Sequence, residues 1–388
     1  MQPPTGGGAK VPGYSTIKPE VQTMMDESLA QQNTIADQAG GRNKMNARQQ
    51  AAMAASQKKA ADRLSSHNKT EGNMAAVGQS KYFRCADGIT RMPYTVLGNI
   101  SLDVKCINFV VIHDFFDTSD ATAIMFKQLV QRHGSLQVVC FNYPGQANTV
   151  WPRLPAEERK RGAREPLLNN DWISDRIHEL LQHAEEDGDV LLTNPFHLVG
   201  IGNGASIAAA FAQRWGNDSR YRDSLRSIVS VNGFLYPDPQ LTAILHSAAQ
   251  VFESTPHNRP DIPVSYWSRF VFSEEYLRRV NPNLALNIYT AVSNPITNDG
   301  RTKLTKGCLQ HRDLRGGLSP DHVPAAGAGP KIAGGPPIQP VQVPIIVLQS
   351  TENTLVSAAN VDPFLAGRNT KHLWSHQLNK ISEAAQVH

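Results

Sequence analysis

The sequence predicts an α/β fold: a mostly parallel sheet with helices on both faces, a helical cap and an extended N-terminal arm. Short apolar runs of strand length recur between segments with helical spacing. Hydrophobic residues make up 40% of the 388 residues, which is enough for a sizeable core. The 28 glycines and 25 prolines show that part of the chain lies outside that core. We therefore expect an arm over 1–80 and one domain over 81–388.

The domain begins with a predicted pair of strands, at 82–88 and 91–99. The continuous apolar run at 107–115 is typical of a parallel strand that is buried on both faces. A helix should follow, because Thr118 and its neighbours supply N-cap side chains and Gly134 supplies a stop.

The same alternation continues along the chain. Further buried strands are predicted at 136–142, 196–200, 227–234 and 343–350, and helices at 172–184 and 204–215. Because strands alternate with helices, neighbouring strands should run parallel, with helices covering both faces of the sheet.

The stretch between the last two strands breaks this alternation. Helical spacing at 238–252 and 266–292 predicts a cap over about 235–318, above the ends of the strands. A Pro/Gly-rich loop without periodicity follows at 319–340.

The N-terminal arm, residues 1–80, has a composition unlike the rest. Tyr14 is its single aromatic residue, and nine basic residues face six acidic ones. Such a segment cannot bury enough apolar surface to fold alone. Two interpretations stay open, a disordered tail and an arm that becomes ordered along a partner.

Composition excludes several classes of function. With no run of 18 apolar residues and no basic-then-apolar start, the sequence predicts neither a membrane span nor a secretory signal. The four cysteines form no CxxC pair, which indicates reduced thiols in a cytoplasmic protein. Thirteen histidines without a Cys/His cluster predict no metal site, and we expect no cofactor. The charged loop at 157–164 includes carboxylates but no aromatic residue, so we expect no nucleic-acid partner.

The most informative stretch is a strand, a glycine-rich turn and a helix at 198–211. This context is typical of the nucleophile elbow, G-x-S-x-G. Here it reads Gly200-Ile201-Gly202-Asn203-Gly204. Gly202 stands at the nucleophile position and has no oxygen with which to attack a carbonyl carbon.

The other stations of a catalytic triad are also degenerate. The acid after the strand at 343–350 best matches Asn353, an amide, although Glu352 is adjacent. The base should be a histidine after the last strand. If that strand is about His372–Leu378, His376 lies within it and His388 is the last residue.

Two further residues near the elbow, Asp114 and Ser206, bear on its chemistry. Asp114 stands at the end of the 107–115 strand, where such enzymes carry a glycine, and its carboxylate would oppose a developing oxyanion. Ser206 is a conceivable substitute nucleophile one turn beyond the elbow, but the simpler interpretation is a small residue that packs a helix on the sheet. A dinucleotide fingerprint is disfavoured because the next strand ends in Val231-Asn232-Gly233, without the acid that binds ribose.

These residues together resemble the N-myc downstream-regulated (NDR) family of non-catalytic α/β-hydrolase-like proteins, over roughly 82–380. The resemblance is carried by His113-Asp114, by Tyr143-Pro144-Gly145-Gln146, by the elbow from Gly200 to Ala205, and by the cap segment at 270–275 with Asn283-Leu284 and Tyr289. The arm and the 319–340 loop depart from the family pattern. The resemblance implies an α/β-hydrolase fold without hydrolase activity.

The leading hypothesis is a pseudoenzyme that serves as a scaffold or adaptor in a larger assembly. Residues 1–80 and 319–340 would contact protein partners. A basic arm suits an acidic polymer such as a microtubule, so a cytoskeletal or ciliary location is the specific form of this hypothesis. Two alternatives stay open: a signalling or stress-response adaptor of the NDR type that binds through its cap, and a residual esterase that uses Ser206.

Overall fold

The computed structural model describes residues 80–98, 106–153, 165–315 apart from 257 and 294, and 339, 341–350, 353–357 and 360. Most of the predicted arm and of the 319–340 loop lies outside this part, as do the charged loop at 157–164, Glu352 and everything after Asn360.

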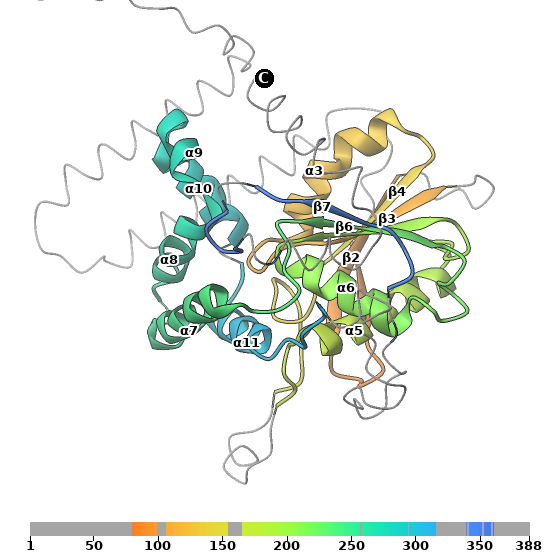
Figure 1. Cartoon of the computed structure of the whole chain (residues 1–388), viewed down its shortest axis with the longest axis horizontal. Helices are drawn as coiled ribbons and strands as arrows, with labels where there is room; N and C mark the ends of the chain where they lie inside the picture. Colours follow the sequence, from red (N-terminus) through yellow and green to blue (C-terminus); the bar gives the residue numbers. More distant parts are fainter. Residues whose placement is uncertain are drawn as a thin grey trace, which may run out of the picture. The chain divides into compact units, whose positions relative to one another are not determined.

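A seven-stranded sheet lies at the centre of the described chain (Figure 1). Its spatial order is β1-β2-β4-β3-β5-β6-β7, in which β2 runs antiparallel to both its neighbours and β3 to β7 run parallel. The mostly parallel sheet was predicted and is confirmed. The strands are β1 (Lys81–Arg84), β2 (Arg91–Gly98), β3 (Ile107–Ile112), β4 (Leu136–Phe141), β5 (Phe196–Ile201), β6 (Leu225–Val231) and β7 (Ile345–Leu348).

The inner strands are apolar on both faces because helices cover both. In β3, Val110 and Ile112 belong to the larger core cluster, whereas Val111 belongs to a smaller cluster on the opposite face. Helix α3 (Ser119–Arg132) covers the smaller cluster, and α5 (Asn170–Glu186) and α6 (Asn203–Trp215) cover the larger one (Figure 1).

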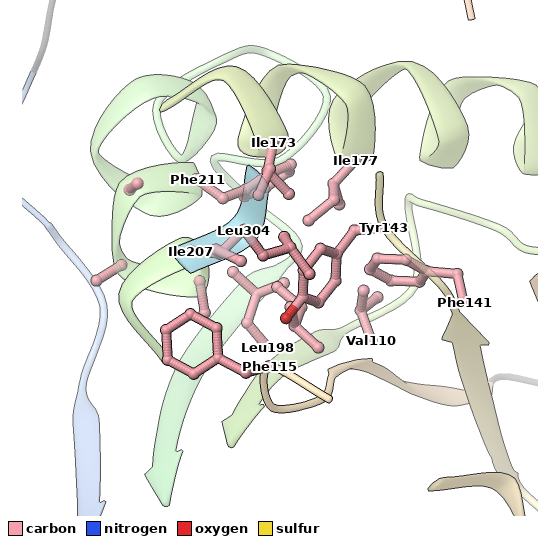
Figure 2. Packing of buried hydrophobic residues seen from close by; sticks show 14 of the residues in the cluster. Val110, Phe115, Phe141, Tyr143, Ile173, Ile177, Leu198, Ile207, Phe211 and Leu304 are labelled. Atoms are coloured by element: carbon pink, nitrogen blue, oxygen red, sulfur yellow. The ribbon is translucent and has the colours of Figure 1, made fainter. Parts of the chain in front are cut away.

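The larger cluster packs sheet residues against α5 and α6. Val110, Phe141 and Leu198 project from three parallel strands toward Ile173 and Phe211 on these two helices (Figure 2). The predicted apolar face of the 172–184 helix is confirmed, since five of its six apolar residues are fully buried and Trp172 is partly buried. All four cysteines are buried, and none of them forms a disulfide bond.

The cap segment contains more helices than the sequence predicts. The stretch at 266–292, which the sequence predicts to be helical, falls in three separate helices. Phe272 has an extended backbone, and Ser273 starts a new helix by accepting the N–H of Tyr276. The next break falls just before Pro282, because proline disfavours the helical conformation of the residue that precedes it. The helices of the whole segment are α7 (Pro239–Ser254), α8 (Asp261–Val271), α9 (Glu274–Arg279), α10 (Pro282–Ser293) and α11 (Asn298–Cys308).

Helix α11 was not predicted. Thr297 caps it by accepting the N–H of Gly300, and Leu304 reaches into the core beside Tyr143 (Figure 2). Its two glycines allow close packing: a Cβ on Gly307 would lie 2.2 Å from the carbonyl oxygen of Leu168. This helix therefore brings the chain after the cap back to the elbow.

Candidate functional site

The parallel strands end at one edge of the sheet, and the elbow lies there. β5 enters the turn at Gly202, and α6 starts at the next residue. Gly202 has φ +54° and ψ −117°, a conformation that disfavours a side chain. The neighbouring Gly204 packs on the end of β3, since a Cβ there would lie 1.9 Å from the carbonyl oxygen of Ile112. The predicted strand–turn–helix geometry of the elbow is therefore present.

The carboxylate of Asp114 lies directly beside Gly202. A Cβ built on Gly202 would fall 2.1 to 2.4 Å from both carboxylate oxygens and from Cγ of Asp114. A nucleophile at position 202 would thus require Asp114 to move. The carboxylate occupies the space that a nucleophilic side chain would fill.

Asp114 also occupies the place of an oxyanion. Its Oδ1 accepts the backbone N–H of Asn203 at 2.9 Å and that of Phe115 at 2.8 Å. An N–H of the residue after the nucleophile and one from the loop after β3 are the donors that form an oxyanion hole in this kind of site. Burial raises the pKa of the Asp114 carboxyl despite these two hydrogen bonds. The sequence predicts a carboxylate at this place, and the structure shows the two backbone N–H groups that it accepts.

Buried polar side chains hold the backbone of Asp114 in place through hydrogen bonds to its carbonyl oxygen. The Tyr143 hydroxyl donates to the Asp114 carbonyl oxygen at 3.1 Å, and Gln146 Nε2 donates to the same atom at 3.0 Å. His113 stacks on Tyr143 and has Asn142 Oδ1 3.0 Å from its Nε2. Tyr143 and Gln146, which the sequence singled out in the YPGQ motif, therefore position Asp114.

His311 reaches the elbow from the segment after α11. Its Nε2 donates to Asn203 Oδ1 at 2.8 Å, and its Nδ1 accepts the N–H of Asn170 at 3.2 Å. Burial lowers the pKa of His311 to about 4, so the ring is neutral near pH 7. Sequence reasoning missed this residue, because no motif surrounds it and the contact spans 108 positions.

The acid and base stations contribute no triad in the described residues. Asn353 Oδ1 accepts the backbone N–H groups of Leu355 at 2.9 Å and Val356 at 3.0 Å, so the amide stabilises a turn. Glu352, His376, His388 and the predicted strand at 372–378 lie outside the described residues.

Ser206 is fully buried in α6. Its hydroxyl accepts from Asn170 Nδ2 at 3.3 Å, and no histidine in the described part of the chain forms a hydrogen bond with it. The residue packs the helix on the sheet, which fits the simpler of its two interpretations.

Asp238, which follows β6, is a buried carboxylate that the sequence did not single out. Its Oδ1 accepts the N–H of Leu241 at 2.8 Å and so caps α7. Its Oδ2 accepts from Ser357 Oγ and, at 2.8 Å, from Asn360 Nδ2. These contacts join the cap to the segment after β7, so the role of Asp238 is structural.

Aromatic side chains fill the space between the strand ends and the cap. Phe115 and Phe116 follow Asp114, and both rings pack on Trp267 of α8, at centroid distances of 5.6 and 4.9 Å. Phe116 also meets Phe252 of α7 at 5.3 Å. A cavity of 320 Å³ lies elsewhere, between the end of α6 and the starts of β6 and β7, beside Asn217 and Arg222.

The described residues hold no group of three or more His, Cys, Asp or Glu side chains that could bind a metal ion. None of their helices is both long enough and apolar enough to cross a membrane.

Comparison with known proteins identifies the fold. No protein-family model and no curated protein matches this chain. A hydrolase from Pseudomonas aeruginosa PA01 aligns with a TM-score of 0.52 and 13% identity, over 75% of this chain and 88% of its own. The enol-lactonase from Burkholderia xenovorans LB400 aligns with a TM-score of 0.51 and 13% identity, over 74% and 87%. The chain has the α/β-hydrolase fold, as the sequence predicts; at this identity the similarity establishes the fold alone.

Proposed function

We propose that this chain is a non-hydrolytic α/β-hydrolase-fold protein that serves as a structural or adaptor component of a larger assembly. One observation carries the proposal: the carboxylate of Asp114 occupies both the oxyanion hole and the space beside Gly202. Acyl transfer develops negative charge on the substrate oxygen, and a carboxylate at that place repels this charge. The site therefore disfavours the transition state of acyl transfer.

The other stations support the same conclusion. Asn353 uses its oxygen to hold a turn, and Ser206 is buried against Asn170 without a base among the described residues. Fold alone does not decide activity, so the argument depends on these contacts.

A rigid folded core combined with long polar extensions suits an adaptor. We propose that residues 1–80 and 319–340 bind protein partners, and that an acidic polymer such as a microtubule is the partner of the basic arm. With this role, the protein would be located in the cytoplasm, at the cytoskeleton or in a cilium.

The cap supports a second candidate, a signalling adaptor of the NDR type. Val271, Tyr276 and Ile288 on the cap helices are 46%, 46% and 57% exposed. Exposed aromatic and aliphatic side chains of this kind are frequent at protein interfaces. In this candidate the cap, rather than the arm, binds the partner.

Hydrolysis is tested with short-chain p-nitrophenyl esters and thioesters on the full chain. We expect no turnover above that of the buffer. The alternative of a residual esterase requires turnover that disappears in Ser206→Ala and persists in Ser230→Ala, a matched change at another buried serine. That result would overturn the non-hydrolytic proposal.

Partner binding is tested by co-sedimentation with microtubules. We expect the full chain to pellet, and a chain that begins at residue 81 to stay in the supernatant. Equal pelleting of both would refute the role of the arm. Binding that survives without the arm but is lost in Tyr276→Ala together with Ile288→Ser would favour the NDR-type candidate.

A further inference from the structure

The cavity at the end of α6 that is remote from the elbow combines apolar side chains with one positive charge. We propose that it binds a small aliphatic monocarboxylate, whose carboxylate contacts Arg222 and whose hydrocarbon chain enters the cavity. Because α6 has 13 residues, its two ends are about 20 Å apart, and the cavity is separate from the site around Gly202. The proposal goes beyond the adaptor function and does not depend on it.

The size of the cavity suits a small organic molecule. Its volume is 320 Å³, near the lower end of the range of about 300–1,000 Å³ that is typical of ligand-binding cavities. The end of α6, the start of β6 and the segment that leads into β7 enclose it. These parts are distant in the sequence, so the cavity is a product of the tertiary fold.

Three apolar side chains line one part of the cavity. Ala212 and Leu225 are 2% and 3% exposed and belong to the larger core cluster, and Val343 is partly buried against the same cluster. The core therefore holds these side chains in place, and they present a hydrocarbon surface to the cavity. Transfer of methylene groups from water to such a surface favours binding of an aliphatic chain.

Hydrogen bonds hold the segment before β7 against the end of α6. The backbone N–H of Gln339 donates to the carbonyl oxygen of Gln213 at 2.9 Å, and Asn217 Nδ2 donates to Gln339 Oε1 at 2.7 Å. Val341, two residues further along, is 6% exposed. Because fixed segments bound the cavity, little conformational entropy is lost when a ligand enters it.

Arg222 supplies the positive charge. Its Nε lies 4.0 Å from Asp223 Oδ1, and the two side chains are 63% and 88% exposed. An ion pair that is this long and this exposed contributes little. No other side chain among the described residues pairs with the Arg222 guanidinium, so its N–H groups are available to bind a carboxylate through two parallel hydrogen bonds.

Other contacts weaken the negative charge near the cavity. Asp218 does not line the cavity, and its Oδ1 accepts the backbone N–H of Arg220 at 2.9 Å. The C-terminus of a helix carries partial negative charge on its carbonyl oxygens. At the end of α6, the carbonyl oxygens of Gln213 and Trp215 already accept backbone N–H groups, at 2.9 and 2.8 Å. Arg222 is therefore the dominant charge at the cavity, which favours an anion over a cation.

The probe is octanoate, titrated into the full chain at pH 7 below its critical micelle concentration and followed by isothermal titration calorimetry. We expect a dissociation constant below about 1 mM. Affinity should rise about three- to fourfold for each methylene group added between butanoate and octanoate, because each one leaves water. Octylamine has the same hydrocarbon chain and the opposite charge, and it should bind about tenfold more weakly than octanoate.

Two arginine variants test the contact with the carboxylate. Arg222→Gln should weaken octanoate binding about tenfold, because the carboxylate loses its charged partner. Arg220→Gln is the matched control and should leave the affinity unchanged, since Arg220 is also exposed, lies two residues earlier and does not line the cavity. Both side chains are exposed, so both variants should fold.

A third variant tests the apolar part of the cavity. Val343→Phe should fill part of it and weaken octanoate binding more than butanoate binding, with circular dichroism to confirm that the variant is folded. The series of carboxylates on the unmodified chain tests the same point if this variant does not fold. Absence of octanoate binding, equal effects of the two arginine changes, an affinity that does not change with chain length, or equal binding of octylamine would each overturn the proposal.

Discussion

Replacing Gly202 with serine should destabilise the protein rather than activate it. The backbone at φ +54° disfavours a side chain, at a cost of about 1–3 kcal/mol. The new Cβ would lie 2.1 Å from Asp114 Oδ1, so the carboxylate must shift and its surroundings must repack, at a further cost of about 1–3 kcal/mol. We therefore expect the free energy of unfolding to fall by about 2–6 kcal/mol.

A matched control isolates the contact with Asp114. Gly188 also has a positive φ, of +74°, but a Cβ on Gly188 would meet nothing within 4 Å. Gly188→Ser therefore measures the backbone strain alone. Each variant is unfolded in urea at pH 7 and followed by circular dichroism, with the free energy taken from linear extrapolation.

A double-mutant cycle completes the test. Asp114→Gly removes the carboxylate, so Gly202→Ser should cost less in that background than in the wild type, with a coupling energy of about 1–3 kcal/mol. The reasoning is refuted if Gly202→Ser costs no more than Gly188→Ser, or if the two changes at the elbow are additive. Ester turnover by Gly202→Ser alone would refute the wider argument about the site.

Three further outcomes are expected. Burial lowers the pKa values of His178 and His311 to about 4, so the folded state binds fewer protons than the unfolded state between pH 6.5 and 4. The free energy of unfolding should therefore be highest above about pH 6.5 and fall toward pH 4, by about 2 kcal/mol for each histidine at pH 5. An unchanged urea midpoint between pH 7 and 5 would contradict this. Asn353→Ala should cost about 1 kcal/mol in urea unfolding because two backbone N–H groups lose their acceptor, whereas Asn353→Asp should keep stability and gain no esterase activity; equal losses in both would argue against the turn. Asp175→Ala should cost about 3–5 kcal/mol, since it leaves the guanidinium of Arg214 buried without its 2.7 Å carboxylate partner, and a loss below 1 kcal/mol would show that this ion pair is unimportant.

The sheet could be predicted from the sequence because each buried strand is a short apolar run. β3, β4 and β5 were all found in this way, and their residues alternate between two cores as the spacing requires. α11 could not be found in this way. Its sequence is mostly polar, and it is held by close contacts of its glycines and by Leu304, which depend on the tertiary structure.

The site was predictable only in part, for a related reason. A motif read along the chain identified Gly202 and placed Asp114 near the oxyanion station. It could not show that Asp114 Oδ1 accepts the N–H of Asn203, because that bond joins residues 89 positions apart. His311 was invisible for the same reason, since only the return of the chain through α11 brings it to the elbow.

The elbow has the glycines of the G-x-S-x-G motif although position 202 carries no nucleophile, and packing explains why. A Cβ on Gly200 would lie 2.3 Å from the Cα of Ala205, and one on Gly204 would lie 1.9 Å from the carbonyl oxygen of Ile112. These glycines are required wherever α6 starts this close to β3 and β5, whatever the site does. A G-x-G-x-G pattern in this context therefore reports the fold. In the function proposed above, activity depends on positions 202 and 114, because Gly202 has no side-chain oxygen and the carboxylate of Asp114 takes the place of a substrate oxyanion.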